Sequence, residues 1–408
     1  MGQVPKLRFP GFNEPWEHRK LSEVTDVRDG THNSPKYYDD GYPLVTSKNV
    51  KDGYVNYDDI QYINKGDYNE INQRSKVDKN DILMGMIGTI GNIALVRENP
   101  TFAIKNVALI KDTNNINYKF LYHCLESSYI KNQLISGING GTQKFISLNK
   151  IRNIDMPFTV ALEQQQIGVF FENLDDLIIL HQCNLDDIKS LKQSMLQKMF
   201  PKNGEDKPEI RFPGFTEPWE QRKLGELGKC QSGIGFPDRE QGGKSGIPFF
   251  KVSDMNNLGN EHEMITANNY VSEDQIARMK WKPVEDVPAI FFAKVGAAVM
   301  LNRKRLCRNS FLLDNNTMAY KLHDSWNVDF AKAIFETIDL TSLVQIGALP
   351  SYNASDVEEM IIILPMNTAE QQQIGAFFKN LDDLITLHQR KLDDLKQLKQ
   401  ALLQQMFI

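Results

Sequence analysis

EQQQIGVFFENLDDLIILHQCNLDDIKSLKQSMLQKMF, residues 163–200, returns as EQQQIGAFFKNLDDLITLHQRKLDDLKQLKQALLQQMF at residues 370–407. The two stretches are identical at 28 of 38 positions. A second pair, PKLRFPGFNEPWEHRKLSEV at 5–24 and PEIRFPGFTEPWEQRKLGEL at 208–227, agrees at 14 of 20 positions. Repeats at one nearly constant offset indicate that this chain of 408 residues is a single unit written twice.

Both copies of the longer stretch predict a long helix with one apolar stripe. The stripe follows alternating steps of three and four residues, through Phe171, Leu174, Ile178, His181, Leu185 and Ile188, and through Phe378, Leu381, Ile385, His388, Leu392 and Leu395. Each helix should have about 37 residues and a length of roughly 55 Å. Such a helix cannot bury its stripe on a small domain alone, so we expect the two to pack on each other, antiparallel, with the histidines fixing the register.

Two details of these helices give further expectations. Thr368 and Gln371 have the spacing of a capping box at the start of the second helix. The acidic pairs that begin at Asp175, Asp186, Asp382 and Asp393 lie off the apolar stripe. We therefore interpret these acidic pairs as a surface that faces solvent or a partner.

The segments between the repeated blocks, 25–162 and 228–369, show little likeness to each other. Both contain short β-rich runs, namely PLVTSKNV at 43–50, DILMGMIGTIGNIALV at 81–96, IPFFKV at 247–252 and AIFFAKVGAAVML at 289–301. Each also predicts a helix, near 117–131 and 327–338. The expected fold class is α+β, with two globular domains separated by two long, antiparallel paired helices and an internal pseudo-two-fold repeat. The predicted boundaries are 1–160, 161–203, 204–367 and 368–408.

Composition places the chain among folded proteins of the cytoplasm. Hydrophobic residues make up 41% and charged residues 24%. The opening MGQVPKLRFPGF has no apolar signal-peptide core, and no apolar run approaches the roughly 18 residues of a membrane span. Cys124, Cys183, Cys230 and Cys307 are scattered without a CxxC pair, so we expect reduced thiols.

The charge balance gives opposing indications about nucleic acid. A net charge of -5 argues against a general nucleic-acid binder. Residues 280–308, however, carry seven lysines and arginines against two acidic residues. A local positive surface is therefore compatible with an acidic chain.

Motifs for chemistry are weak. QGGKSG at 241–246 resembles a phosphate-binding loop but has Asp238 where the first glycine is needed. Gly85, Gly88 and Gly91 are spaced by three, unlike a dinucleotide fingerprint, and are better read as turns between strands. We predict that the chain carries no catalytic residue and no metal site.

Several segments together resemble the specificity subunits of type I restriction-modification enzymes. These are RFPGF-x-EPWE-x-RKL in both halves, PLVTSKNV, DILMGMIGTIGN, GGTQKFISLNKI at 140–151 with GALPSYNASDV at 347–357, and EQQQIG leading into FF-x-NLDDLI-x-LHQ. The resemblance covers essentially the whole chain. It implies two target-recognition domains, at 1–160 and 204–367, each reading one half of an asymmetric, bipartite DNA site, with the conserved helices between them.

The resemblance also implies partners. Catalysis would belong to DNA adenine methyltransferase subunits, which bind S-adenosylmethionine and dock on the conserved helices, and to ATP-dependent restriction subunits, which use ATP and Mg²⁺. This chain would bind double-stranded DNA and no cofactor, and would have no contact with a membrane. The alternative is a protein-interaction scaffold that binds no DNA and uses its paired helices to hold partners.

Base reading requires Arg, Lys, Asn or Gln on positioned loops, whereas phosphate contacts require only positive charge and backbone NH groups. The candidates share a place beside strand ends or glycine-rich turns. In the first half they are Lys48, Asn49, Arg74, Lys76, Thr89, Asn92, Gln143 and Lys144. In the second half they are Lys251, Lys294, Arg303, Lys304, Arg305, Arg308, Asn309, Ser351, Tyr352 and Asn353. Trp16 and Trp219, at matching positions of the repeat, are instead predicted to pack in the interior.

Overall fold

The computed structural model describes residues 4–51, 53–136, 144–202, 204–344 and 349–407. The chain divides into two units. Unit 1 comprises residues 1–182 together with 390–408, and unit 2 comprises residues 183–389. Among the described residues, no helix is both long enough and apolar enough to cross a membrane.

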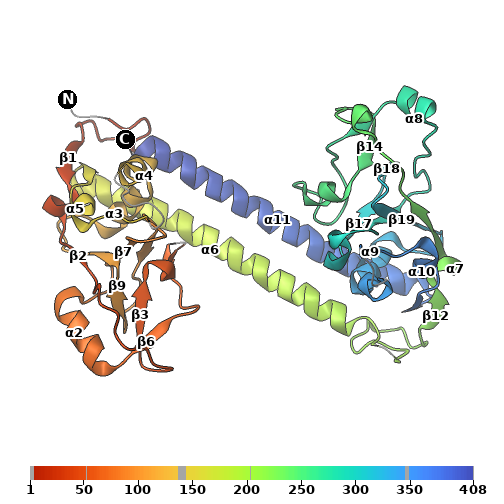
Figure 1. Ribbon diagram of the computed structural model, residues 1–408, viewed down its shortest axis with the longest axis horizontal. Helices are drawn as coiled ribbons and strands as arrows, with labels where there is room; N and C mark the ends of the chain where they lie inside the picture. The colour runs from red at the N-terminus through yellow and green to blue at the C-terminus, as the bar shows by residue number, and fades with distance from the viewer. Residues whose placement is uncertain (1–3, 52, 137–143, 203, 345–348, 408) are drawn as a thin grey trace. The chain divides into compact units, whose positions relative to one another are not determined.

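Two long helices dominate the secondary structure: α6 (Ala161–Lys198) and α11 (Thr368–Met406), with 38 and 39 residues (Figure 1). Both lengths agree with the sequence prediction. The predicted stripe is largely buried, since Phe171, Leu185 and Leu392 are each at most 2% exposed. The stripe prediction is therefore confirmed.

The helices run antiparallel within each unit. In unit 1 the ring of Phe171 in α6 lies 6.0 Å from that of Phe407. One turn further along α6, Asp175 pairs with Lys399, which lies two turns before Phe407 in the chain, so the two helices run in opposite directions. In unit 2 the ring of Phe200 lies 5.7 Å from that of Phe378, and Lys192 pairs with Asp382. Each unit is thus completed by the end of the other repeat's helix.

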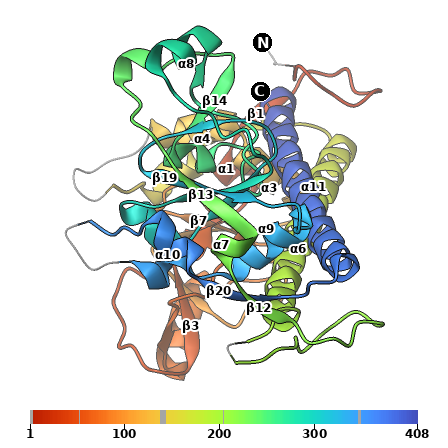
Figure 2. The ribbon, with the colours of Figure 1, turned by 90° about the vertical axis from the view of Figure 1, so that its right-hand side faces the viewer.

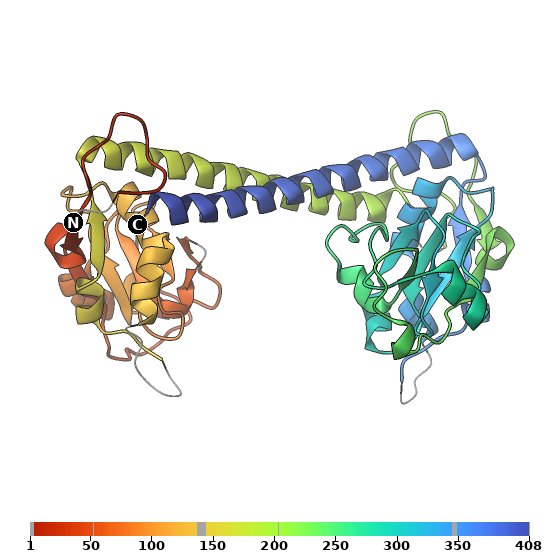
Figure 3. The same ribbon diagram turned by 90° about the horizontal axis from the view of Figure 1, so that it is seen from above.

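The remaining elements of unit 1 form a small mixed domain on one side of its helix stretches (Figure 3). In chain order they are β1 (Glu17–Lys20), α1 (Leu21–Val24), β2 (Val27–Asp29), β3 (Tyr42–Thr46), η1 (Ser47–Asn49), β4 (Val50–Lys51), β5 (Tyr54–Val55), β6 (Gln61–Ile63), α2 (Lys65–Ser75), β7 (Ile82–Gly85), β8 (Ile93–Leu95), β9 (Ala103–Lys105), β10 (Val107–Ile110), α3 (Tyr118–Glu126), α4 (Ser128–Ile135), α5 (Leu148–Arg152) and β11 (Asp155–Phe158).

Unit 2 has a matching domain, seen with β13 and β19 side by side in Figure 2. Its elements are β12 (Glu220–Lys223), α7 (Leu224–Leu227), β13 (Gly228–Ser232), η2 (Asp238–Glu240), β14 (Ile247–Phe250), η3 (Val252–Asn256), β15 (Tyr270–Val271), α8 (Glu273–Met279), β16 (Ala289–Ala293), η4 (Ala297–Leu301), β17 (Lys304–Cys307), β18 (Leu312–Leu313), β19 (Thr317–Leu322), α9 (Val328–Thr337), η5 (Leu340–Leu343), α10 (Ala354–Glu358) and β20 (Ile361–Leu364).

The two domains share one topology despite their dissimilar sequences. The four-stranded sheets have the orders β2-β10-β7-β8 and β13-β19-β16-β17. The three-stranded sheets, β6-β3-β9 and β15-β14-β18, each combine an antiparallel and a parallel pair. The pairs β1-β11 and β12-β20 close the domains at the frame. The α+β prediction is confirmed, and the shared topology defines equivalent positions in segments that sequence alone could not align.

An aromatic core joins each domain to its helices. Trp16 is 1% exposed and packs edge-on against Phe120 of α3 and Phe407. Trp219 is 3% exposed and packs in the same way against Phe330 of α9 and Phe200. The prediction that both tryptophans pack in the interior is confirmed.

Two predictions for the helices were wrong. Asn367, not Thr368, caps α11, because its side chain accepts the Ala369 NH. The acidic residues Asp175 and Asp382 do not face solvent: Asp382 is 4% exposed, and both are ion-paired within their units. Sequence spacing placed them off the apolar stripe correctly but could not show that a globular domain covers that side of each helix.

Candidate functional site

A buried ion pair at the start of each long helix anchors the domain to it. In unit 1 the carboxylate of Glu163 accepts two bonds from the Arg8 guanidinium, at 2.6 and 2.9 Å, and a third from the Trp16 indole at 3.1 Å. In unit 2 Glu370 accepts from Arg211 at 2.6 and 2.8 Å and from Trp219 at 3.2 Å. Hydrogen bonding to the carboxylate raises the pKa of both arginines. The RFPGF and EQQQIG motifs are therefore two sides of one structural joint.

The remaining residues of the EQQQIG motif hold the start of a domain helix, α3 in unit 1 and α9 in unit 2. The side-chain amide oxygen of Gln164 accepts from the backbone NH of Asn117, whose own side chain caps α3. The side chain of Gln371 does the same for Asn327 and α9. A Cβ at Gly168 would meet the Phe120 nitrogen at 2.9 Å, and one at Gly375 would meet the Phe330 nitrogen at 2.6 Å. Only glycine allows the helix ends to approach this closely.

We expect Glu163→Ala to destabilise unit 1 strongly, because it leaves the Arg8 charge buried and unpaired. Breaking a buried pair in this way costs roughly 3–5 kcal/mol. Urea unfolding followed by tryptophan fluorescence measures the loss. The matched control is Glu359→Ala, whose partner Lys223 is exposed and whose loss should change stability little, because water screens the pair. Equal losses in the two variants would contradict the assigned joint.

At the other end of unit 1, strand ends and turns form what we call the first strand-end surface. Gly88, with φ +75°, makes the turn after β7, and its NH bonds to the Lys144 carbonyl at 3.3 Å. The Ser47 hydroxyl donates to the Asn106 carbonyl at 2.6 Å and accepts the Met86 NH at 3.0 Å. These bonds hold together the turn residues of the surface, which are Thr31, Thr46, Lys48, Gly88, Thr89, Lys105, Asn106, Lys144 and Phe145.

Unit 2 builds the second strand-end surface around an equivalent turn, but a direct backbone bond stands where the Ser47 hydroxyl bridges in unit 1. Gly296, with φ +86°, bonds to the Pro350 carbonyl at 2.9 Å, and the Lys294 NH bonds to the Asn316 carbonyl at 2.9 Å. Strand β14 runs beside β18 as β3 runs beside β9, which makes Lys251 equivalent to Thr46. The surface comprises Ile234, Lys251, Lys294, Gly296, Asp314, Asn315, Asn316, Pro350 and Ser351.

Sequence reasoning missed one feature of the first surface. Lys36 lies 5.4 Å from the ring of Tyr38, and the Lys105 ammonium donates to Ser34 at 2.6 Å and to the Tyr37 hydroxyl at 3.3 Å. Tyr37 and Tyr38 are 38% and 40% exposed. Basic and aromatic side chains interleaved in PKYY were a usable signal. Asn106, Asn315 and Asn316 were also missed, because their turns follow short strands that the sequence does not delimit.

The predicted residues of unit 1 fall into two groups. Lys48, Thr89 and Lys144 belong to the first strand-end surface, and Asn92 is exposed at the end of the same turn. Arg74 pairs with Asp29, which also accepts from His32 beside that surface. Lys76 instead pairs with Asp78 at 3.2 Å. Gln143 lies outside the described residues.

In unit 2 Lys251, Lys294 and Ser351 belong to the second strand-end surface, and Asn353 is exposed where it caps α10. Burial lowers the pKa of Lys294 despite the carboxylate of Asp314 nearby. Arg303 is exposed and donates to Asn256 at 2.7 Å, and Asn309 is exposed. Arg308 is ion-paired with Glu263 and Asp329, at 3.0 and 2.8 Å.

Burial removes four predicted residues from the candidate surface. Asn49 is 2% exposed, and its amide bonds Thr46 and Asn56. Tyr352 is 4% exposed and donates to the Ala293 carbonyl at 2.6 Å. Lys304 donates to the Ile338 carbonyl, and burial lowers its pKa to about 8.

Arg305 is the fourth, since it donates to the Asn260 and Lys304 carbonyls. The positive run at 303–308 was misleading because neighbouring side chains of strand β17 lie on opposite sides of the sheet, and both sides are covered: Lys304 bonds a backbone carbonyl on one side and Arg305 bonds one on the other.

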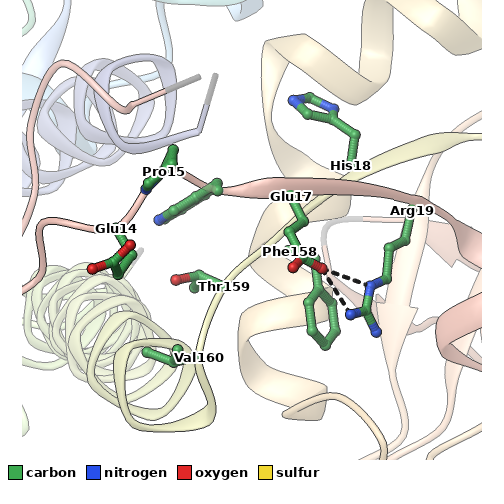
Figure 4. Close-up of a pocket in the computed structure, with 9 residues that line it drawn as sticks. Glu14, Pro15, Glu17, His18, Arg19, Phe158, Thr159 and Val160 are labelled. Atoms are coloured by element: carbon green, nitrogen blue, oxygen red, sulfur yellow. Dashed lines mark hydrogen bonds and ion pairs between the residues drawn. The ribbon is translucent and has the colours of Figure 1, made fainter. Parts of the chain in front are cut away.

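A hollow of about 940 Å³ lies in the frame of unit 1, away from the strand-end surface. Figure 4 shows its wall, where Arg19 reaches Glu17 and lies over the Phe158 ring at 4.2 Å. The lining residues run over Glu14–Arg19 and Phe158–Val160. These residues belong to the frame of unit 1, and the ion pair between Arg19 and Glu17 among them is exposed.

The comparisons agree with this architecture. The family model of the type I restriction modification DNA specificity domain matches residues 13–190 and 216–397, one match for each repeat. The chain belongs to this family. Specificity subunits are non-catalytic components of restriction-modification enzymes, and the chain is one of them.

Individual relatives give the same result. The MjaIX specificity subunit of Methanocaldococcus jannaschii is 22% identical over 99% of this chain and 93% of its own length. The EcoBI specificity subunit of Escherichia coli is 32% identical over 40% of this chain and 35% of its own. The crystal structure of the type I S subunit from M. genitalium superposes with a TM-score of 0.68 at 15% identity, covering 100% of this chain and 99% of that one. This likeness concerns the fold.

Proposed function

We propose that the chain reads a bipartite, asymmetric DNA site, with one half-site contacted by each strand-end surface. One observation carries this proposal: the two surfaces share a strand topology and an equivalent glycine turn but have different side chains at equivalent positions. Lys105 corresponds to Asp314, Thr46 to Lys251, Met86 to Lys294 and Lys144 to Pro350. A shared scaffold with exchanged hydrogen-bonding groups is what two readers of different base sequences require.

The side chains suit contacts with DNA. Lysine can donate to guanine and asparagine can bond adenine in the major groove, while exposed lysines and backbone NH groups bind phosphates. The first surface supplies Lys48, Lys105, Asn106 and Lys144, and the second supplies Lys251, Lys294, Asn315 and Asn316. In the first surface Tyr37 adds an aromatic face beside Lys105, and Tyr38 adds one beside Lys36.

The helices would carry the partner subunits. Exposed leucines recur on them at equivalent positions, with Leu177, Leu180 and Leu398 in unit 1 and Leu384, Leu387 and Leu191 in unit 2. Repeated apolar groups on a helix surface support docking of two like partners. We propose that these are DNA adenine methyltransferase subunits carrying S-adenosylmethionine, that restriction subunits using ATP and Mg²⁺ join them, and that the assembly acts in the cytoplasm.

We expect Lys105→Ala and Lys294→Ala to weaken binding of a duplex that contains the complete site. Each lost phosphate contact should make the slope of log K against log salt shallower by about 0.9, and a lost base contact should cost about 1–3 kcal/mol. Titration at several salt concentrations separates the two effects. Lys202→Ala, an exposed lysine outside both surfaces, is the control. If neither variant differs from this control, the surfaces do not bind DNA and the scaffold alternative is favoured.

A further inference from the structure

One lysine in unit 1 connects the second repeat's helix to two carboxylates of the first repeat. The Lys399 ammonium of α11 lies 2.6 Å from Glu126, the last residue of α3, and 2.7 Å from Asp175 of α6. The three side chains are 12, 20 and 16% exposed. His123 contacts Glu126 at 2.9 Å from within α3.

Unit 2 contains the same arrangement with the repeats exchanged. The Lys192 ammonium of α6 lies 2.5 Å from Glu336 near the end of α9 and 2.7 Å from Asp382 of α11. Lys192 and Lys399 occupy equivalent positions, as do Asp175 and Asp382. The glutamates also correspond, since each is the ninth residue after its asparagine cap. Although the domain sequences differ, this contact has been kept in both.

Charge and burial make these contacts strong. Burial lowers the pKa of Lys192, but the carboxylates of Glu336 and Asp382 outweigh burial, so the net shift is upward and the ammonium stays charged. Lys332 at 2.5 Å adds a second cation beside Asp382, whereas burial lowers the pKa of His262, 3.4 Å away, to about 4 and leaves that ring neutral. Partly buried pairs are screened by salt much less than exposed pairs.

The position of each lysine is as informative as its charge. The first end of α3 is held by Gln164 and Gly168 at Asn117, and Lys399 holds the other end at Glu126. A helix held at one end can pivot, whereas one held at both ends cannot. Unit 2 holds α9 at Asn327 and at Glu336 in the same way.

We infer that Lys399 and Lys192 are positioning residues, each of which fastens one recognition domain through the helix of the opposite repeat. The orientation of each reader then depends on both halves of the chain. The inference rests on the proposed function for its consequence in DNA recognition, but the fastening itself can be measured without DNA.

Hydrogen exchange on the full chain tests the fastening. Lys399→Met, which keeps length and apolar contact, should speed amide exchange in α3 at least about tenfold, equivalent to about 1.4 kcal/mol of local opening, and leave α9 unchanged. Lys192→Met should do the reverse. Arginine at either position should restore slow exchange. Lys396→Met and Lys189→Met, which remove exposed lysines one turn earlier on the same helices, are the controls.

Methylation by the chain assembled with its methyltransferase then tests the positioning, on duplexes whose half-site spacing is varied by single base pairs. The wild type should accept one spacing. Lys399→Met and Lys192→Met should each also accept neighbouring spacings while keeping the base preferences of the wild type. Unchanged exchange in both methionine variants would overturn the inference, as would faster exchange with an unaltered spacing requirement. A wild-type assembly that shows normal exchange but no sequence preference would overturn the proposed function instead, and with it the positioning role.

Discussion

Replacing residues 21–154 by residues 224–360 should produce a protein whose two half-sites both have the sequence now read by unit 2. The exchanged segments begin directly after β1 and β12 and end directly before β11 and β20. The pairs β1-β11 and β12-β20 are equivalent and antiparallel. The transplanted segment carries every base-reading candidate of unit 2 from Lys251 to Asn353. Sequencing of methylated adenines in DNA exposed to the assembled enzyme would measure the change.

The exchange should be tolerated because the contacts at the joint are duplicated. Phe330 would replace Phe120 against Phe407, Asn327 would replace Asn117 against Gln164, and Glu336 would replace Glu126 beside Lys399. Lys332 would add a second cation near Asp175, as it does now at Asp382. The joint of Arg8, Trp16 and Glu163 stays untouched.

The reciprocal exchange, residues 21–154 in place of 224–360, is the matched control and should double the other half-site. If a folded exchange variant still methylates the original asymmetric site, the base readers lie in the frame and not in the transplanted segments. A folded variant that methylates without any base preference would show that the two domains read DNA only jointly.

The sequence predicted those parts of the fold that depend on periodic burial. The stripe from Phe171 to Ile188 required only a 3.6-residue period, and the two copies of the motif confirmed each other. The predicted capping box at Thr368 does not form, because the side chain of Gln371 instead bonds the Asn327 NH and the Pro365 carbonyl. A local pattern cannot reveal that a distant helix competes for the same amide.

The candidate surfaces were predicted less well because they are made by non-local contacts. Thr89 and Lys144 are 55 residues apart in sequence but are brought together through Gly88. Lys304 is a residue type that often contacts DNA, yet the sheet directs its side chain inward, where its ammonium donates to the Ile338 carbonyl. Charge counted along the chain cannot distinguish the two sides of a strand, whereas the turn predicted at Gly88 is present, with φ +75° at that glycine.

Lengthening both helices by four residues should increase the required distance between the half-sites by about two base pairs. Each helix passes from one unit to the other near Gln182 and Gln389, so insertions after these residues leave the contacts inside each unit intact. Insertion after Leu191 would be a poorer test, because Lys192 follows and would be pulled from Glu336 and Asp382.

The expected magnitude follows from helix geometry. Four residues add about 6 Å and slightly more than one turn, since a turn takes 3.6 residues. At 3.4 Å per base pair this corresponds to about two base pairs. Insertion of a single residue in each helix is the contrasting variant, because it rotates everything beyond it by about 100° and should damage helix pairing. Mapping methylated sites for both variants gives the spacing directly. If the four-residue variant is active at the original spacing only, the helices serve as a docking platform and do not set the distance between the readers.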